Sequence, residues 1–271
     1  MNITDDQKET YRADGAICLR GVFNKHWIDV ATEGIERLLA NPSDHAEAIK
    51  GKTGPGSYFN DFGNWQRIPE FEDFVRNSPA GKLVGQLVGT KRVTFYHEHV
   101  LIKEPGTLKE TPWHHDQSYY PINGDLVASI WMPLDPVPLE TSIQFVKGSH
   151  KWGKWFYPRK FESFESYTAN KEISGQVFEK VPDIDSEINK HEILSWAVEP
   201  GDCVVFHMKA LHTAPGNINM ERSRRVLSTR WLGDDACIAE RPWDLPLPII
   251  GGLSPGDPVV SDMFPTVWSQ A

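Results

Sequence analysis

The sequence predicts a mainly β protein, a sandwich or barrel, with helices packed outside it. From about residue 91 onward, short runs of β-branched and aromatic residues alternate with turns rich in proline and glycine. The part before residue 91 instead carries apolar residues at helical spacing. The chain has 271 residues, of which 39% are hydrophobic, so it can bury one large core. We therefore expect a single domain over residues 1–271.

The N-terminal part, about 1–90, is expected to be helical. A capping box predicts a helix over 4–12, followed by a turn and a strand over 16–19. A second helix is expected over 24–40, because an asparagine can cap its start and Asn-Pro follows its end. The polar stretch 43–63 is expected to be loop, and 71–87 to be one amphipathic helix.

The core is expected over about 91–235. Its predicted strands are 93–96, 100–102, 127–131, 142–146, 203–206 and 226–230. Residues 150–195 interrupt this series with an aromatic and charged insert, which we expect to pack as a lid. The tail after Arg241 is rich in proline and glycine and is expected to wrap the surface.

Composition excludes several classes of protein. The net charge of −9 argues against a nucleic-acid partner, which would require a basic surface. The three cysteines, Cys18, Cys203 and Cys237, are widely spaced and are expected to be reduced. The N-terminus lacks the pattern of a secretory signal, and no apolar run approaches the roughly 18 residues of a membrane span. We expect a cytoplasmic protein, a monomer or homodimer, with a small-molecule partner.

The segment Trp113-His114-His115-Asp116 carries the clearest chemistry. If it is a strand, alternation places His114 and Asp116 on one face and His115 on the other. An imidazole and a carboxylate that project together are two members of a 2-His-1-carboxylate triad, which binds Fe(II) and leaves positions open. Alone, a His-x-Asp pair is common and is more often a surface or core pair.

A second histidine and an arginine follow in the expected order. His212 comes just after the strand predicted over 203–206, and Arg224 opens the strand that follows the next turn. In a β barrel, distant strands can return to the same mouth, so His212 can complete the triad. The planar guanidinium of Arg224 suits a carboxylate bound several ångströms from the metal.

With these residues, the chain resembles the phytanoyl-CoA dioxygenase family of Fe(II)/2-oxoglutarate oxygenases. The family pattern Trp-His-x-Asp-x-x-x-Tyr is matched over residues 113–120, and its strand tryptophan by Trp131. Its Pro-Gly-Ser-His turn is matched over 147–150 without the proline. Its Asp-Gly turn is matched at 14–15, and its Arg-Arg-x-Leu strand over 224–227. The resemblance extends from about residue 4 to about 235.

The resemblance implies a double-stranded β-helix (jelly-roll, cupin-like) core and a set of site residues. It assigns the metal, and with it catalysis, to His114, Asp116 and His212. It assigns 2-oxoglutarate to Arg224, with Trp131, His99 and Thr213 in the cosubstrate pocket. Residues expected to contact the substrate are Lys103, Tyr119, Tyr120 and Arg159.

Two departures from the family pattern concern the cosubstrate. The family commonly has His-Gly-Ser at the distal ligand, whereas this chain has His212-Thr213-Ala214, so the hydroxyl of Thr213 is one position out of register. The spacing to Arg224 is one residue longer than usual. The usual spacing would select Ser223, which cannot pair with a carboxylate; Arg222 and Arg225 also remain open.

The resemblance implies an enzyme that uses Fe(II), 2-oxoglutarate and O2 to hydroxylate a small-molecule metabolite, releasing succinate and CO2. Asp116 argues against halogenation, since related halogenases replace this carboxylate. Two alternatives stay open. One is a cupin-type metal enzyme that does not use 2-oxoglutarate, against which Arg224 argues. The other is a non-catalytic binding member of the family, against which the intact triad argues.

Overall fold

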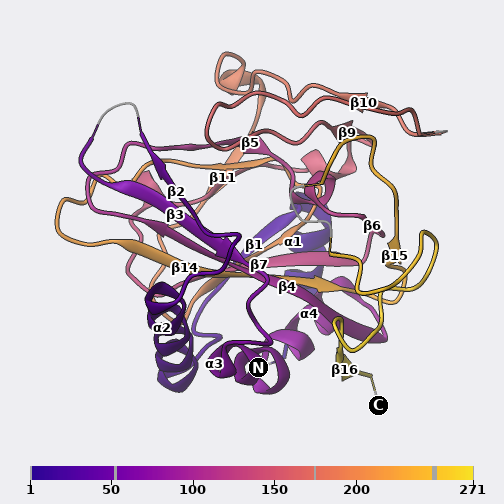
Figure 1. Cartoon of the computed structure of the whole chain (residues 1–271), viewed down its shortest axis with the longest axis horizontal. Coiled ribbons are helices and arrows are strands. Elements are labelled where there is room, and N and C mark those ends of the chain that lie inside the picture. Colours follow the sequence, from indigo (N-terminus) through magenta and orange to yellow (C-terminus); the bar gives the residue numbers. More distant parts are fainter. Residues whose placement is uncertain (1, 52–53, 174, 246–248, 271) are drawn as a thin grey trace.

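The computed structural model describes residues 2–51, 54–173, 175–245 and 249–270. Two facing antiparallel sheets form its centre (Figure 1). The large sheet contains β1 (Ala16–Leu19), β2 (Glu47–Lys50), β3 (Ser57–Phe62), β4 (Arg92–Lys103), β7 (Val127–Pro133), β12 (Cys203–His207), β14 (Arg224–Leu232) and β16 (Thr266–Ser269). The small sheet contains β5 (Thr111–His114), β8 (Gln144–Val146), β11 (Ile193–Ser195) and β13 (His212–Ala214). This is the predicted jelly roll.

Strand order explains how residues far apart in sequence become neighbours. The large sheet runs β1-β12-β7-β14-β4-β3-β2, with β16 also paired to β4, and the small sheet runs β11-β8-β13-β5. Apolar side chains from both sheets fill the space between them, among them Trp131, Phe145 and Phe206. The inner faces of β4, β7 and β14 therefore look toward β5 and β13.

Helices cover the outer face of the large sheet (Figure 1). They are α1 (Asp5–Asp14), α2 (Lys25–Ala40), α3 (Pro69–Asn77) and α4 (Ala80–Val88). The predicted capping box is present, since Thr4 and Gln7 each bond to the other's backbone N–H. None of the helices in the described ranges is long and apolar enough to cross a membrane.

Two expectations for the N-terminal part were wrong. The helix predicted over 71–87 is two helices, α3 and α4, because Pro79 has no N–H to donate and disfavours helical geometry at Ser78. The stretch 43–63, predicted to be loop, contains the β2–β3 hairpin, in which Glu47 lies opposite Asn60. Tyr58 and Asn60 are buried on one face of β3, against the site described below.

The insert and the tail are mostly irregular. The insert forms η3 (Ser149–Lys151), a parallel pair of β9 (Trp155–Phe156) and β10 (Phe178–Glu179), and η4 (Ile188–Lys190). Its end, β11, pairs with β8 in the small sheet. Just before the tail, β15 (Cys237–Ile238) pairs with β6 (Ile122–Asn123), and in the tail β16 extends the large sheet. The three cysteines are free thiols, as predicted.

Candidate metal centre

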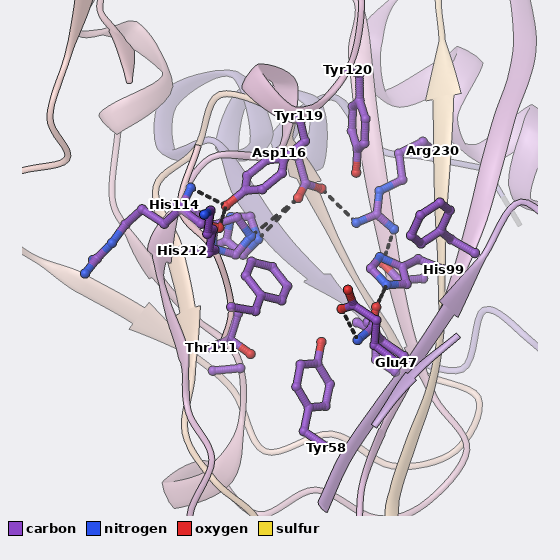
Figure 2. A pocket seen from close by; sticks show the side chains of 18 of the residues that line it. Glu47, Tyr58, His99, Thr111, His114, Asp116, Tyr119, Tyr120, His212 and Arg230 are labelled. Carbon is purple, nitrogen blue, oxygen red and sulfur yellow. Dashed lines mark hydrogen bonds and ion pairs between the residues drawn. The ribbon is translucent and has the colours of Figure 1, made fainter. Parts of the chain in front are cut away.

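His114, Asp116 and His212 meet between the two sheets, with their ligand atoms within 4.8 Å of one another. The Oδ1 atom of Asp116 lies 3.7 Å from the Nε2 atom of each histidine. All three side chains are buried. Figure 2 shows them grouped on one side of a cavity. The structure thus brings together the three residues that the sequence singled out.

Strand pairing and a short turn place these ligands. His114 is the last residue of β5 and His212 the first of β13, and the two face each other across the ladder. Asp116 was expected to lie on a strand, and this expectation was wrong. The strand ends at His114, and Asp116 opens the 3-10 turn η1 (Asp116–Tyr119). His115 lies away from the centre, hydrogen-bonded to the Ser118 hydroxyl and the Phe156 amide.

The imidazoles present lone pairs to the centre. The Nδ1 atom of His114 lies 2.7 Å from the Pro112 carbonyl, and that of His212 lies 3.0 Å from the Ala210 carbonyl. A carbonyl only accepts, so each Nδ1 carries the proton and each Nε2 is bare. Burial lowers the pKa of His212 to about 3, which keeps it neutral at pH 7. Two bare nitrogens and a carboxylate oxygen fit a divalent metal ion.

The second oxygen of Asp116 is held by the large sheet. Its Oδ2 accepts from Ser129 Oγ at 2.7 Å and from Arg230 Nη2 at 3.1 Å. Burial raises the pKa of Asp116, but the positive charge of the Arg230 guanidinium opposes this effect, and the pKa lies well below its usual value. Sequence reasoning missed Arg230. The signal was alternation along β14, which places Arg224, Ser228 and Arg230 on one face.

The cavity beside the triad measures about 460 Å³. Its walls are largely aromatic, and the exposed acidic side chains of Asp44, just before β2, and Glu47, the first residue of β2, also line it. The aromatic side chains are Tyr58, Phe62, Tyr119, Tyr120, Trp131, Phe161, Tyr167 and Phe206. Figure 2 shows Arg230 and His99 across the cavity from the histidine ligands, with Tyr58 between the two sides. A ring-sized small molecule fits this volume.

A chain of hydrogen bonds joins the cavity mouth to the interior. Asn60 donates to Glu47 at 3.3 Å and lies 3.1 Å from His99 Nε2. Because a carboxylate only accepts, the Asn60 amide must donate to Glu47 and its oxygen must accept from His99. The pKa of His99 lies well below its usual value, and burial is the largest cause. His99 is therefore a neutral ring held by the hairpin.

Arg224 and Lys103 are two buried basic residues at neighbouring strand ends. They lie opposite each other on β14 and β4. Arg224 donates to the carbonyls of Thr141 and Pro215. Lys103 donates to the carbonyls of Ala214 and Pro215, and both of its hydrogen bonds are 2.8 Å long. Neither forms an ion pair with a carboxylate in the described ranges. Burial lowers the pKa of Arg224 to about 10 and holds the pKa of Lys103 well below its usual value.

The remaining predicted contact residues lie in different places. Trp131, His99, Tyr119, Tyr120 and Arg159 line the cavity beside the triad, whereas Lys103 and Arg224 are not among its lining residues. Thr213 instead lines a second cavity of about 350 Å³ beneath the insert, and its hydroxyl donates to the Thr111 carbonyl at 2.5 Å. The Thr213 hydroxyl therefore lies away from the triad.

The sequence profile of the phytanoyl-CoA dioxygenase (PhyH) family matches residues 11–226. The chain belongs to this family. A comparison with curated protein sequences found no match.

Solved structures confirm the fold expected of a phytanoyl-CoA dioxygenase family member. The non-heme alpha-ketoglutarate-dependent carbocyclase SnoK from nogalamycin biosynthesis has a TM-score of 0.73 at 22% identity, covering 98% of this chain and 97% of its own. The epimerase SnoN, in complex with Fe3+, alpha-ketoglutarate and nogalamycin RO, has 0.73 at 20%, covering 97% and 98%. EctD from S. alaskensis, with 2-oxoglutarate and 5-hydroxyectoine, has 0.65 at 17%, covering 91% and 82%.

The family's usual serine after the distal ligand has no equivalent here. Ala214 stands at that position and lines the cavity, while the Thr213 side chain lies on the other side of β13. In this phytanoyl-CoA dioxygenase family member, the hydroxyl group near Ala214 is instead that of Tyr58, on β3. The cationic group is the guanidinium of Arg224, on β14. The two are close enough that the Arg224 charge opposes the rise that burial causes in the pKa of Tyr58.

Proposed function

We propose that the protein is an Fe(II)- and 2-oxoglutarate-dependent oxygenase that hydroxylates a small-molecule metabolite. The observation that carries this proposal is the triad itself. The bare Nε2 atoms of His114 and His212 and the inner oxygen of Asp116 converge beside a cavity large enough for a substrate. Bound Fe(II) and 2-oxoglutarate would supply O2 activation, with succinate and CO2 as co-products. The structures of SnoN with Fe3+ and of EctD with 2-oxoglutarate support the choice of ligands.

Arg224 is the residue we assign to the far carboxylate of 2-oxoglutarate. A buried guanidinium without a carboxylate partner is costly, and an anionic ligand would offset that cost. Lys103, on the neighbouring strand, lies opposite Arg224 and donates to the same carbonyl, that of Pro215. Arg225 is excluded from this role because its guanidinium pairs with Asp135 at 2.8 Å. Arg230 is committed to Asp116.

The substrate is assigned to the open part of the cavity. Tyr119 and Phe161 pack against the ring of His114, with ring centroids 5.5 and 5.1 Å from it. A substrate ring resting on these side chains would lie next to the metal. Arg159 holds this wall in place, since its amide donates to the Tyr119 hydroxyl at 2.8 Å. The triad would then reach a C–H bond of a bound ring.

Spectroscopy tests this proposal without knowledge of the substrate. Anaerobic addition of Fe(II) and 2-oxoglutarate should give a weak visible charge-transfer band. Asp116→Ala should lose the band, and Arg224→Gln should require more 2-oxoglutarate to reach it. Succinate release should then be measured across a panel of metabolites. Absence of both the band and succinate release would overturn the proposal, while iron binding without 2-oxoglutarate binding would favour a different metal enzyme.

A further inference from the structure

Ser129 and Arg230 form a clamp on the outer oxygen of Asp116. They lie directly opposite each other on β7 and β14, so their side chains share one face of the large sheet. Both donate to Oδ2 of Asp116, at 2.7 and 3.1 Å. The opposite oxygen, Oδ1, is the one that faces the two histidines. Figure 2 shows the Arg230 bond crossing from the large sheet to the turn that carries Asp116.

Arg230 has little freedom to take any other position. Its Nη1 donates to Ser228 Oγ at 2.8 Å, and its guanidinium carbon lies 5.9 Å from the ring centre of Tyr120. The residue is 4% exposed, so solvent does not compete for its hydrogen bonds. The clamp is therefore a fixed part of the barrel interior.

The clamp has the opposite effect on ligand strength to the groups that support the histidines. The carbonyls behind His114 and His212 accept a hydrogen bond from the Nδ1–H group of each ring and make each Nε2 a stronger metal ligand. A guanidinium on a carboxylate does the opposite, because it draws charge away from the oxygens. Arg230 thus weakens one metal ligand and adds positive charge to the site.

We propose that Arg230, assisted by Ser129, is a positioning residue that limits Asp116 to one oxygen toward the metal and favours binding of the dianionic cosubstrate. This inference rests on the proposed function. With Oδ2 occupied, the carboxylate cannot present both oxygens to the ion. Positions that a second oxygen would fill are then left for the 2-oxo acid group. The added positive charge favours a dianion over a neutral ligand.

Substitution of Arg230 should change the two affinities in opposite directions. In Arg230→Gln, Fe(II) should bind as tightly as in the wild type or more tightly, because Asp116 becomes a stronger ligand. The affinity for 2-oxoglutarate should fall by about tenfold or more, because a buried positive charge close to the site is lost. Anaerobic titration, with protein fluorescence for Fe(II) and the visible band for 2-oxoglutarate, measures both.

Arg225→Gln is the matched control. It removes the same charge from another position of β14, on the opposite face of the strand, and also leaves a carboxylate, that of Asp135, without its partner. Both affinities should stay at the wild-type values. Ser129→Ala removes one of the two hydrogen bonds with little change in volume. It should lower 2-oxoglutarate affinity several-fold without lowering Fe(II) affinity. If Arg230→Gln does not fold, this variant tests the inference in its place.

Three outcomes would overturn the inference. They are a parallel loss of both affinities in Arg230→Gln, unchanged affinities in that variant, and an effect of Arg225→Gln equal to that of Arg230→Gln. Failure of the proposed function looks different, because the wild-type protein itself would then show no band with Fe(II) and 2-oxoglutarate.

Discussion

His114 and His115 are sequence neighbours with opposite surroundings. Alternation along the chain separated them correctly, although the strand ends at His114. The same reasoning did not find Ser129 or Arg230, because a hydroxyl and a cation carry no metal-ligand signature. Their role becomes visible only when strand register places them opposite each other, beside Asp116. Ligand identity is therefore a local property of the sequence, whereas ligand support depends on pairing between distant strands.

Substitution of His115 should affect stability rather than metal binding. His115→Ala removes hydrogen bonds to Ser118 and Phe156 and should lower the free energy of unfolding by about 1–3 kcal/mol. Its Fe(II) affinity should stay close to that of the wild type. His114→Ala should reduce Fe(II) affinity by more than the roughly 10–100-fold that loss of an outer-shell partner costs. Equal losses of affinity in the two variants would contradict this assignment.

Acid should destabilise the metal-free protein through His97 and His207. Burial lowers the pKa of each to about 3, from an unfolded value of 6.5. Between these pH values the unfolded chain takes up protons that the folded chain does not, so the free energy of unfolding falls as pH falls. One pKa unit corresponds to about 1.4 kcal/mol, which gives roughly 2 kcal/mol for each ring between pH 6.5 and pH 5.

Urea unfolding at pH 7 and pH 5 measures this dependence. His207→Gln should reduce it, because a glutamine does not titrate. His26→Gln is the control, since His26 is exposed. A pH dependence that is unchanged in His207→Gln would show that this ring is not its source.

At the scale of elements, periodicity located the helices but not their breaks or the edge of the sheet. The helix over 71–87 divides at Pro79 because backbone chemistry outweighs the apolar pattern that continues across it. The β2–β3 hairpin was hidden by its polar composition. Only Tyr58, Phe59 and Phe62 mark β3 as a strand. The polar side chains of Asn60 and Asp61, one on each face, form hydrogen bonds with Glu47 and Asn64 inside the structure.

Gly85 is the point where α4 packs against the tail strand β16. A Cβ atom at this position would lie 2.2 Å from the Trp268 ring. Gly85→Ala should therefore lower the free energy of unfolding by about 1–3 kcal/mol, although alanine is the better helix former. Lys82→Ala, on the exposed side of the same helix, is the control and should cost nothing. Chemical denaturation compares them, and a more stable Gly85→Ala variant would refute this packing.

At the scale of the molecule, the triad lies where the two sheets meet. His114 and His212 belong to the small sheet, while the clamp on Asp116 belongs to the large one. The order of motifs along the chain predicted this barrel and brought out the three residues of the candidate metal centre, because each keeps a fixed place relative to a strand. The cavity walls were predicted only in part. Several predicted contacts line the cavity, but the hairpin residues Tyr58 and Asn60 were missed, because periodicity is weak there.

Metal binding should stabilise the whole barrel. A ligand that binds only the folded state at a hundredfold excess over its Kd adds about 2.7 kcal/mol. Under anaerobic conditions Fe(II) should therefore raise the Tm of the wild type, and 2-oxoglutarate should raise it further. Asp116→Ala should show neither increase. An equal rise of Tm in Asp116→Ala would place the bound metal elsewhere.

The β2–β3 hairpin gives this scaffold a means of changing its selectivity. It contributes Glu47, Tyr58 and Asn60 to the cavity but none of the three triad residues. It is also the outermost part of its sheet, since β2 pairs only with β3. Exchanging this segment for one of different length or charge would change the lining of the cavity while leaving the three residues of the candidate metal centre in place. The cavity wall and the candidate metal centre thus lie in separate stretches of the chain, and selection can act on one without the other.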